Sequence, residues 1–131
     1  MPRYAPTIAD IESLAQAAVE RLPDLFRHHL ATVLLRVEDF PDEEVMLAME
    51  LETPFDILGL YWGHHVGDSA AGMTGAMPPT ICLYRRALLD EWAHGEETLA
   101  GLVTHVLVHE VGHHFGLSDD DMHAIEESAA E

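Results

Sequence analysis

The residues best suited to chemistry form the stretch HEVGHHFGLSD, from His109 to Asp119. On a helix, His109 and His113 lie one turn apart and project from the same face. Two imidazoles at that spacing can converge on one ion, with zinc–nitrogen bonds of about 2.0–2.1 Å. Glu110 follows the first histidine, so its carboxylate can lie beside the metal without binding it. That position suits a general base acting on a metal-bound water.

The third ligand is expected just after the helix. Gly116 can adopt a positive φ, end the helix and turn the chain back toward the ion. Asp119 follows three residues later, and a carboxylate oxygen binds zinc at about 2.0–2.2 Å. Alternatively, Ser118 or Asp119 could cap a following helix, from which His123 would return to the ion. The spacing after the glycine favours Asp119.

The length of the motif decides its weight, because the chain contains ten histidines. HExxH alone would arise by chance in roughly 8% of shuffled sequences of this composition. Requiring Gly116 and Asp119 as well lowers that figure to under about one in a thousand. The extended pattern therefore points to a metal site much more strongly than the short one.

The pattern HExxHxxGxxD resembles the signature of metzincin-like zinc proteases, and its surroundings resemble small bacterial zincin-like metallopeptidases. The resemblance covers at least Thr53 to about Glu126. Three segments carry it: PFDILGLY (54–61), PTICLYRR (79–86) and VHEVGHHFGLSDD (108–120). It implies a zinc-dependent peptidase with Glu110 as the base and three ligands: His109, His113 and Asp119.

Two departures from the resemblance are visible. Family members carry an acidic residue and a short apolar segment where this chain has Trp62-Gly63-His64-His65, so substrate preference does not transfer through this region. Metzincins also have a methionine-bearing turn well downstream of the third ligand. Met122 lies too close to Asp119 to match that turn without distortion.

Other polar residues near the motif have plainer interpretations. His105 precedes His109 by one turn, but a straight helix cannot wrap three such side chains around one tetrahedral ion. We therefore expect His105 to support the site or the fold. His114 points about 100° away from His113 and is expected to be structural. His64 and His65 could bind substrate, but they are more simply expected to be exposed. Tyr84, Arg85 and Arg86 could stabilise an oxyanion or bind a carboxylate of the substrate. The two arginines are more simply expected to pair with acidic residues on the surface.

Composition indicates one domain spanning residues 1–131, with 48% hydrophobic residues and hence a packed core. The net charge is −18, and all six basic residues are arginines, which disfavours nucleic acid as a partner. Cys82 is the lone cysteine, excludes an intrachain disulfide and is expected to be a small buried residue. We find no secretory signal and no apolar run of ~20 residues, so a cytoplasmic, reduced setting without membrane insertion is expected.

Periodicity and capping residues predict an α+β fold, a single compact zincin-like domain. About three to four short strands would pack on helices that include the HExxH helix. In zincins that this chain resembles, an edge strand runs over the active-site helix and holds an extended peptide, and Thr80–Tyr84 is the candidate here. The predicted strands cover residues 32–37, 57–62 and 80–84; the predicted helices cover 8–22, 25–28, 42–51, 85–92, 96–116 and 119–128, with a long loop over 63–79.

The leading functional hypothesis is a Zn²⁺-dependent metallopeptidase acting on a peptide or protein substrate. One alternative is a metal-dependent hydrolase of a non-peptide substrate such as RNA. The acidic charge and a glutamate in the base position argue against it. Another is a non-catalytic metal-binding or interaction domain built on a zincin scaffold.

Overall fold

The computed structural model describes residues 5–62 and 79–129. Within these ranges nine side chains lie outside the description: those at positions 25, 29, 62, 111, 113–115, 128 and 129. The loop predicted over 63–79, which contains His64 and His65, therefore falls almost wholly outside the described residues.

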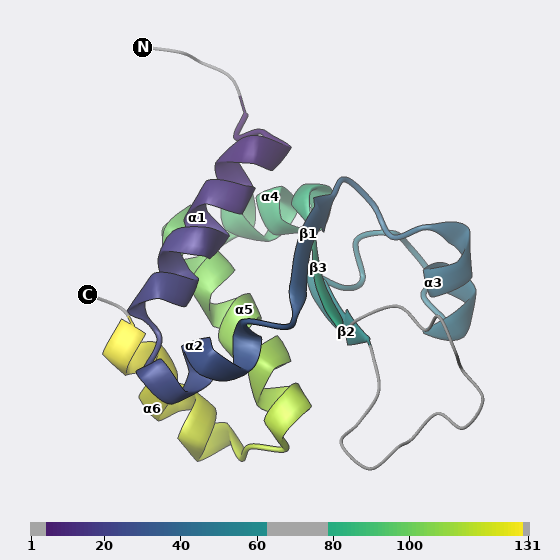
Figure 1. The fold of residues 1–131 in the computed structure, drawn as a ribbon. Helices are drawn as coiled ribbons and strands as arrows, with labels where there is room; N and C mark the ends of the chain where they lie inside the picture. Colours follow the sequence, from purple (N-terminus) through teal and green to yellow (C-terminus); the bar gives the residue numbers. More distant parts are fainter. Residues whose placement is uncertain (1–4, 63–78, 130–131) are drawn as a thin grey trace, which may run out of the picture.

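The described chain forms six helices and three strands, and it confirms the predicted α+β fold (Figure 1). Every predicted element is present, with bounds that differ from the prediction by at most three residues. In chain order these are α1 (Ile8–Arg21), α2 (Asp24–Leu30), β1 (Leu34–Glu38), α3 (Glu43–Ala48), β2 (Gly59–Trp62), β3 (Thr80–Tyr84), α4 (Arg85–His94), α5 (Leu99–Phe115) and α6 (Asp119–Ala129).

Side-chain caps explain where two of the helices begin. At α1, Thr7 Oγ1 accepts from Asp10 N at 3.1 Å, and Asp10 Oδ2 accepts from Thr7 N at 2.8 Å. This capping box satisfies two backbone donors that the first turn leaves unpaired. At α3, Asp42 Oδ1 accepts from Val45 N at 2.8 Å. α3 ends earlier than predicted, and Glu50 follows it with a φ of 53°.

The sheet has the order β1-β3-β2. β1 runs parallel to β3, with Leu34 opposite Thr80, whereas β2 runs antiparallel to β3, with Gly59 opposite Leu83. All five residues of β3 are buried. The prediction that Thr80–Tyr84 is a substrate-holding edge strand is therefore wrong, because β3 is central and both of its hydrogen-bonding sides are already used by neighbouring strands.

The two faces of the sheet have different partners. Ile81 and Leu83 point into the main core, which α1 and α5 complete on one face. Cys82 and Tyr84 alternate to the other face, where they pack with residues of and before β2. Burial raises the pKa of the Cys82 thiol to about 11, as befits the small buried residue that the sequence predicts.

β2 approaches α5 closely, and a glycine makes this possible. A Cβ at Gly59 would lie 2.9 Å from Val106 Cγ1 of α5 and 3.2 Å from the backbone oxygen of Cys82. Any side chain there would push the strand away from the helix. Gly59 thus fixes β2 beside the helix that carries the motif.

Candidate metal centre

The N-terminal part of α5 anchors the motif in the core. Thr98 Oγ1 accepts from Gly101 N at 3.0 Å and caps the start of the helix. The buried residues that follow are apolar on several sides of the helix: Leu102, Val103, Val106, Leu107 and Val108. Such a helix suits burial among other elements, and α5 packs against α1, α4, α6 and the sheet. His109 and Glu110 come directly after this buried segment and are half-buried.

α5 ends at the glycine, as the sequence predicts. Gly116 has a φ of +66°, and the Leu117 amide donates to the Gly112 carbonyl at 2.9 Å. These are the features of a Schellman C-cap, which uses the left-handed region that glycine enters without a steric penalty. Among the described residues, no atom lies within 4 Å of a Cβ built at Gly116, so the positive φ is the described reason for a glycine there.

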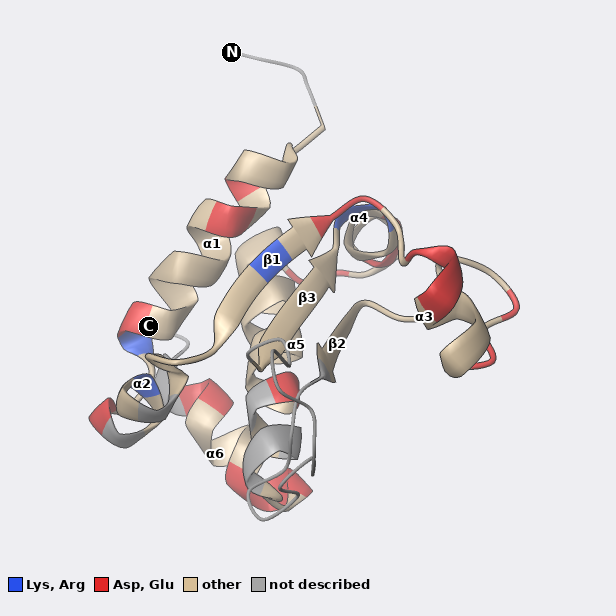
Figure 2. Cartoon of the chain, turned by 45° about the vertical axis from the view of Figure 1, so that its right-hand side comes forward, with Lys and Arg blue, Asp and Glu red and all other residues tan. Residues whose placement is uncertain are grey.

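The structure shows whether Ser118 or Asp119 caps α6. Ser118 Oγ accepts from Asp121 N at 3.1 Å, so Ser118 is the residue that caps α6. Asp119 is the first residue of that helix and is exposed. The acidic start of α6 lies just beyond the C-terminal end of α5 (Figure 2).

A tight contact holds α6 against the motif. A Cβ at Gly112 would lie 2.0 Å from Met122 Sδ, so the observed placement of the Met122 side chain against α5 requires that residue 112 lack a side chain. Met122 is 3% exposed and packs with Leu22 and Val108. Sequence reasoning weighed Met122 only against the methionine-bearing turn and did not predict this packing contact. The available signal was a glycine in the middle of an otherwise strong helix, which often marks close packing.

The residues predicted to form the zinc site come from α5 and from the start of α6. His109 and Glu110 are described in full, whereas the side chain of His113 lies outside the description. The backbone places His113 one turn after His109 on the same helix. The pairing of these two histidines, and the return of Asp119 to the same ion, therefore remain predictions.

A second polar group next to His109 was missed by sequence reasoning. His105 Nδ1 lies 2.8 Å from Glu126 Oε1 and 3.0 Å from Oε2, which ties α5 to α6. The rings of His105 and His109 are 4.2 Å apart between centroids, with a tilt of 43°. No local pattern identifies Glu126, because the contact depends on how α6 folds back along α5.

His123, the alternative third ligand, interacts along its own helix. Its Nε2 lies 3.4 Å from Glu127 Oε1, and both side chains are 72% exposed. Met122, its neighbour, faces the core instead.

The arginines near β3 serve as anchors. Arg85 Nη1 lies 2.9 Å from Asp39 Oδ1, and its Nε donates to the Pro6 carbonyl at 2.6 Å. The expected pairing with a surface acid is thus confirmed for Arg85. The Arg86 guanidinium lies over the ring of Phe40, 5.4 Å from its centroid. Tyr84 is 1% exposed, and burial raises its pKa, so it acts here as a core residue.

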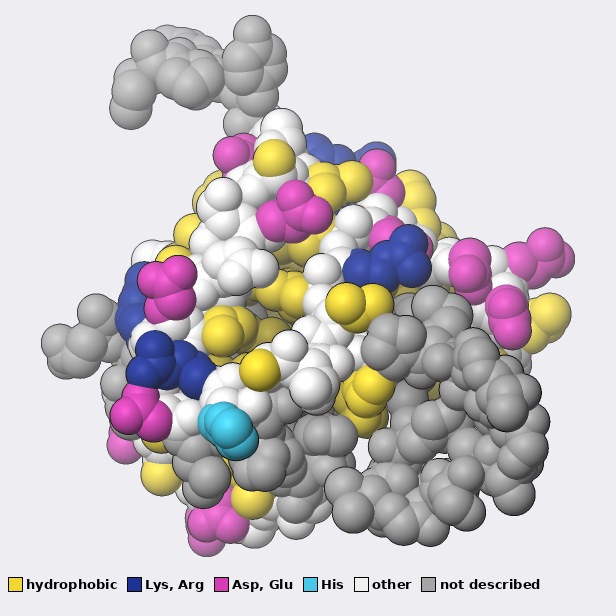
Figure 3. Space-filling model, in the orientation of Figure 1, with side chains coloured by type: hydrophobic (Ala, Val, Ile, Leu, Met, Phe, Trp, Pro, Cys, Tyr) yellow, Lys and Arg dark blue, Asp and Glu magenta, His cyan; other side chains and the backbone are white. Residues whose placement is uncertain are grey.

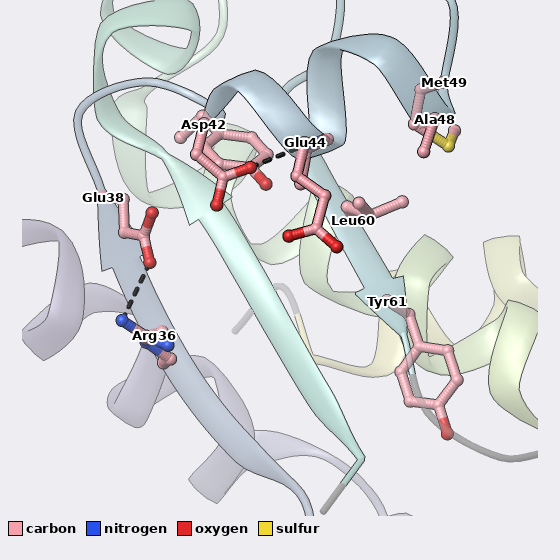
Figure 4. Close-up of a pocket in the computed structure, with 10 residues that line it drawn as sticks. Arg36, Glu38, Asp42, Glu44, Ala48, Met49, Leu60 and Tyr61 are labelled. Carbon is pink, nitrogen blue, oxygen red and sulfur yellow. Dashed lines mark hydrogen bonds and ion pairs between the residues drawn. The ribbon is translucent and has the colours of Figure 1, made fainter. Parts of the chain in front are cut away.

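A separate hollow of about 820 Å³ opens on the sheet face opposite the main core (Figure 4). It lies between the sheet and α3, and its lining includes an ion pair of 3.0 Å between Arg36 and Glu38. The described residues that line it include none of the predicted zinc-site residues.

Acidic side chains are spread over the face drawn in Figure 3 rather than gathered in one patch. This distribution agrees with the net charge of −18. Within the described residues, no helix is both long and apolar enough to span a membrane.

Comparison with known families agrees with the motif and the fold. The sequence profile of a family described as zincin-like metallopeptidase matches residues 30–129. No curated protein sequence matches the chain significantly. The matched region contains the whole sheet, α5 and all of α6. The chain therefore belongs to the zincin-like metallopeptidase family.

Proposed function

We propose that this protein is a zinc-dependent metallopeptidase that hydrolyses peptide bonds. Glu110 would be the general base, and the ligands would be His109, His113 and Asp119. The proposal rests on the change in burial along α5. Its buried segment gives way at once to a half-buried histidine and glutamate, and the helix then ends at Gly116 immediately before an exposed aspartate.

The donor set fits zinc. Imidazole nitrogen and carboxylate oxygen are both common zinc ligands, and catalytic zinc sites use three protein ligands. Ser118 caps α6, so Asp119 is not needed for that purpose. The 3.4 Å contact of His123 with Glu127 on the exposed side of α6 supports Asp119 over His123 as the third ligand.

Zinc, when bound, would activate a water molecule and polarise the scissile carbonyl. Glu110 would accept the proton of that water and pass it to the leaving amine. Glu110 directly follows His109 on the same helical turn, which would let its carboxylate lie beside the ligands. The Schellman turn at Gly116 would aim Asp119 toward α5.

Among the described strands, β2 best fits the role of holding an extended peptide substrate, which the sequence analysis predicted for Thr80–Tyr84. It lies at one edge of the described sheet and packs against α5. The close approach of Gly59 to Val106 sets its distance from the helix. A peptide added along this edge would be held by main-chain hydrogen bonds, which tolerate many side chains.

The test is hydrolysis of a quenched fluorescent peptide library, with and without a chelator, by wild type and Glu110→Gln. We expect chelator-sensitive cleavage by wild type, and a loss of about 10²–10⁴-fold in Glu110→Gln, whose amide cannot accept the proton. The zinc content of both proteins should be the same. Glu127→Gln, the same change on an exposed side chain, should cleave at the wild-type rate.

Two results would contradict the proposal. Equal cleavage by wild type and Glu110→Gln would show that Glu110 is not the base. A zinc-loaded wild type that cleaves no peptide would favour the non-catalytic scaffold. A parallel assay with labelled RNA tests the other alternative, and we expect no cleavage because the chain carries a net charge of −18.

A further inference from the structure

We infer that α5 carries a second divalent-cation position, formed by His105, His109 and Glu126. It lies one helical turn before the proposed zinc site and shares His109 with it. The inference goes beyond the proposed function, because it rests on described side chains and requires no catalytic activity.

The geometry of the three side chains suits a metal ion. One ligand atom from each residue lies within 4.8 Å of those from the other two. Bonds of about 2.0–2.1 Å in a tetrahedral site place ligand atoms about 3.4 Å apart, so ligand atoms that already lie within 4.8 Å of one another need a modest rearrangement to enclose zinc. His105 Nδ1 and Glu126 Oε1 are hydrogen-bonded at 2.8 Å, so a cation would replace the proton between them, release it to solvent and move the two atoms slightly apart. The carboxylate therefore lies beside His105 before any ion binds.

Exposure allows a cation to enter. The side chain of His105 is 44% exposed and that of Glu126 is 22% exposed. The ion would meet solvent on one side, and the partly buried carboxylate would attract it more strongly than a fully solvated one does. Two imidazoles and one carboxylate form a set that zinc, cobalt and nickel accept.

Helical spacing explains why there should be two positions rather than one larger site. His105, His109 and His113 recur at intervals of four residues, and a straight helix cannot wrap all three around one tetrahedral ion. Each neighbouring pair can instead form its own chelate with a carboxylate from α6. In the structure Glu126 is hydrogen-bonded to His105 and lies within 4.8 Å of the ligand atom of His109, and Asp119 would serve the second pair in the proposed site. A cation at the first position thus draws His109 away from the second.

The competing explanation is that His105 and Glu126 form an ion pair that only joins α5 to α6. Both explanations predict some loss of stability when the pair is removed. Only a metal position predicts that removing Glu126 weakens cation binding in a protein that lacks His113. The test therefore uses His113→Ala as its background.

Zinc is titrated into the apo forms of wild type, His113→Ala, His113→Ala/Glu126→Gln and His113→Ala/Glu127→Gln, against a competing chelating indicator. We expect His113→Ala to bind one zinc, less tightly than wild type. Adding Glu126→Gln should weaken that binding at least about tenfold. Adding Glu127→Gln should not change it, because Glu127 contacts the exposed His123 instead.

Absence of zinc binding by His113→Ala, or equal binding with and without Glu126→Gln, would overturn the inference. Melting curves of the apo proteins check that each is folded. If His113→Ala is not, Asp119→Ala replaces it as the background. The two proposals fail differently: equal affinity of wild type and His113→Ala would remove the proposed zinc site, yet leave the second position standing.

Discussion

The two ends of α5 differ in almost every physical respect. From Leu99 to Val108 most side chains are buried, and the buried polar residue Thr104 donates its hydroxyl proton to the Ala100 carbonyl at 2.9 Å. From His109 onward the two described side chains of α5, those of His109 and Glu110, are polar and half-buried. One continuous helix thus contains a buried segment, Leu99–Val108, followed by a partly exposed polar segment that begins at His109. We call the buried segment the anchor.

The difference shows how a small domain can hold reactive groups in place. Burying an imidazole or a carboxylate without a partner costs free energy, so the polar end must stay near solvent. Precise placement, however, needs rigid support. α5 meets both needs by fixing its first ten residues in the core and letting the next turn emerge. Substitutions in the anchor should therefore change stability, whereas those in the polar end should change binding and catalysis.

The largest effect should be on zinc affinity at the polar end. His109→Ala and Asp119→Ala should each weaken zinc binding by orders of magnitude, because each removes a proposed ligand. His123→Ala should leave the affinity nearly intact. The free energy of unfolding of the apo proteins should change by about 1 kcal/mol or less, as is usual away from the core. Competition titration and urea unfolding measure the two quantities. A strong loss only in His123→Ala would identify His123 as the ligand.

The opposite pattern is expected in the anchor. Leu107 is 1% exposed, and Leu107→Ala would leave a cavity in the main core. The expected loss in the free energy of unfolding is about 2–5 kcal/mol, measured by urea unfolding. The protein that remains folded should bind zinc with near wild-type affinity. A large drop in affinity at unchanged stability would contradict the division between the two ends.

Local features of α5 could be predicted from the sequence alone. The HExxH spacing and the terminating glycine each depend on residues within a few positions of one another. Such interactions leave a readable pattern. Gly116 is the clearest case, because only its own φ requires a glycine.

Contacts between distant segments could not be predicted in the same way. The composition of β3 is compatible with either an edge or a central strand. Its central position in the sheet depends on pairing with β1, which lies more than forty residues away in the sequence. The contacts of Glu126 with His105 and of Met122 with Gly112 likewise depend on the direction in which α6 leaves the turn. A single sequence records neither strand order nor that direction.

Two glycines next to the site sharpen the comparison, because they are required for different reasons. Gly112→Ala places a methyl group against Met122 and should cost about 1–3 kcal/mol through overpacking. Alanine gains about 1 kcal/mol in a helix interior, so the net loss of stability should be at most about 2 kcal/mol. Gly116→Ala meets no atom of the described residues but must adopt a φ of +66°, which costs about 1–2 kcal/mol.

A double-mutant cycle separates the two causes. Met122→Ala should relieve much of the penalty of Gly112→Ala and none of that of Gly116→Ala. The quantity to measure is the free energy of unfolding of the apo proteins. Additive effects of Gly112→Ala and Met122→Ala would show that the two residues do not limit how closely α5 and α6 pack.

The smallest effect is expected at the cap of α6. Ser118→Ala removes the oxygen that accepts from Asp121 N and should cost about 1 kcal/mol of unfolding free energy. Zinc affinity should stay close to wild type, since the Schellman bond from Leu117 to Gly112 still sets the direction of the turn. Ser118→Asp restores a capping oxygen and should recover the stability. If Ser118→Ala instead weakens zinc binding as strongly as Asp119→Ala at unchanged stability, the serine takes part in the metal site and the cap is incidental.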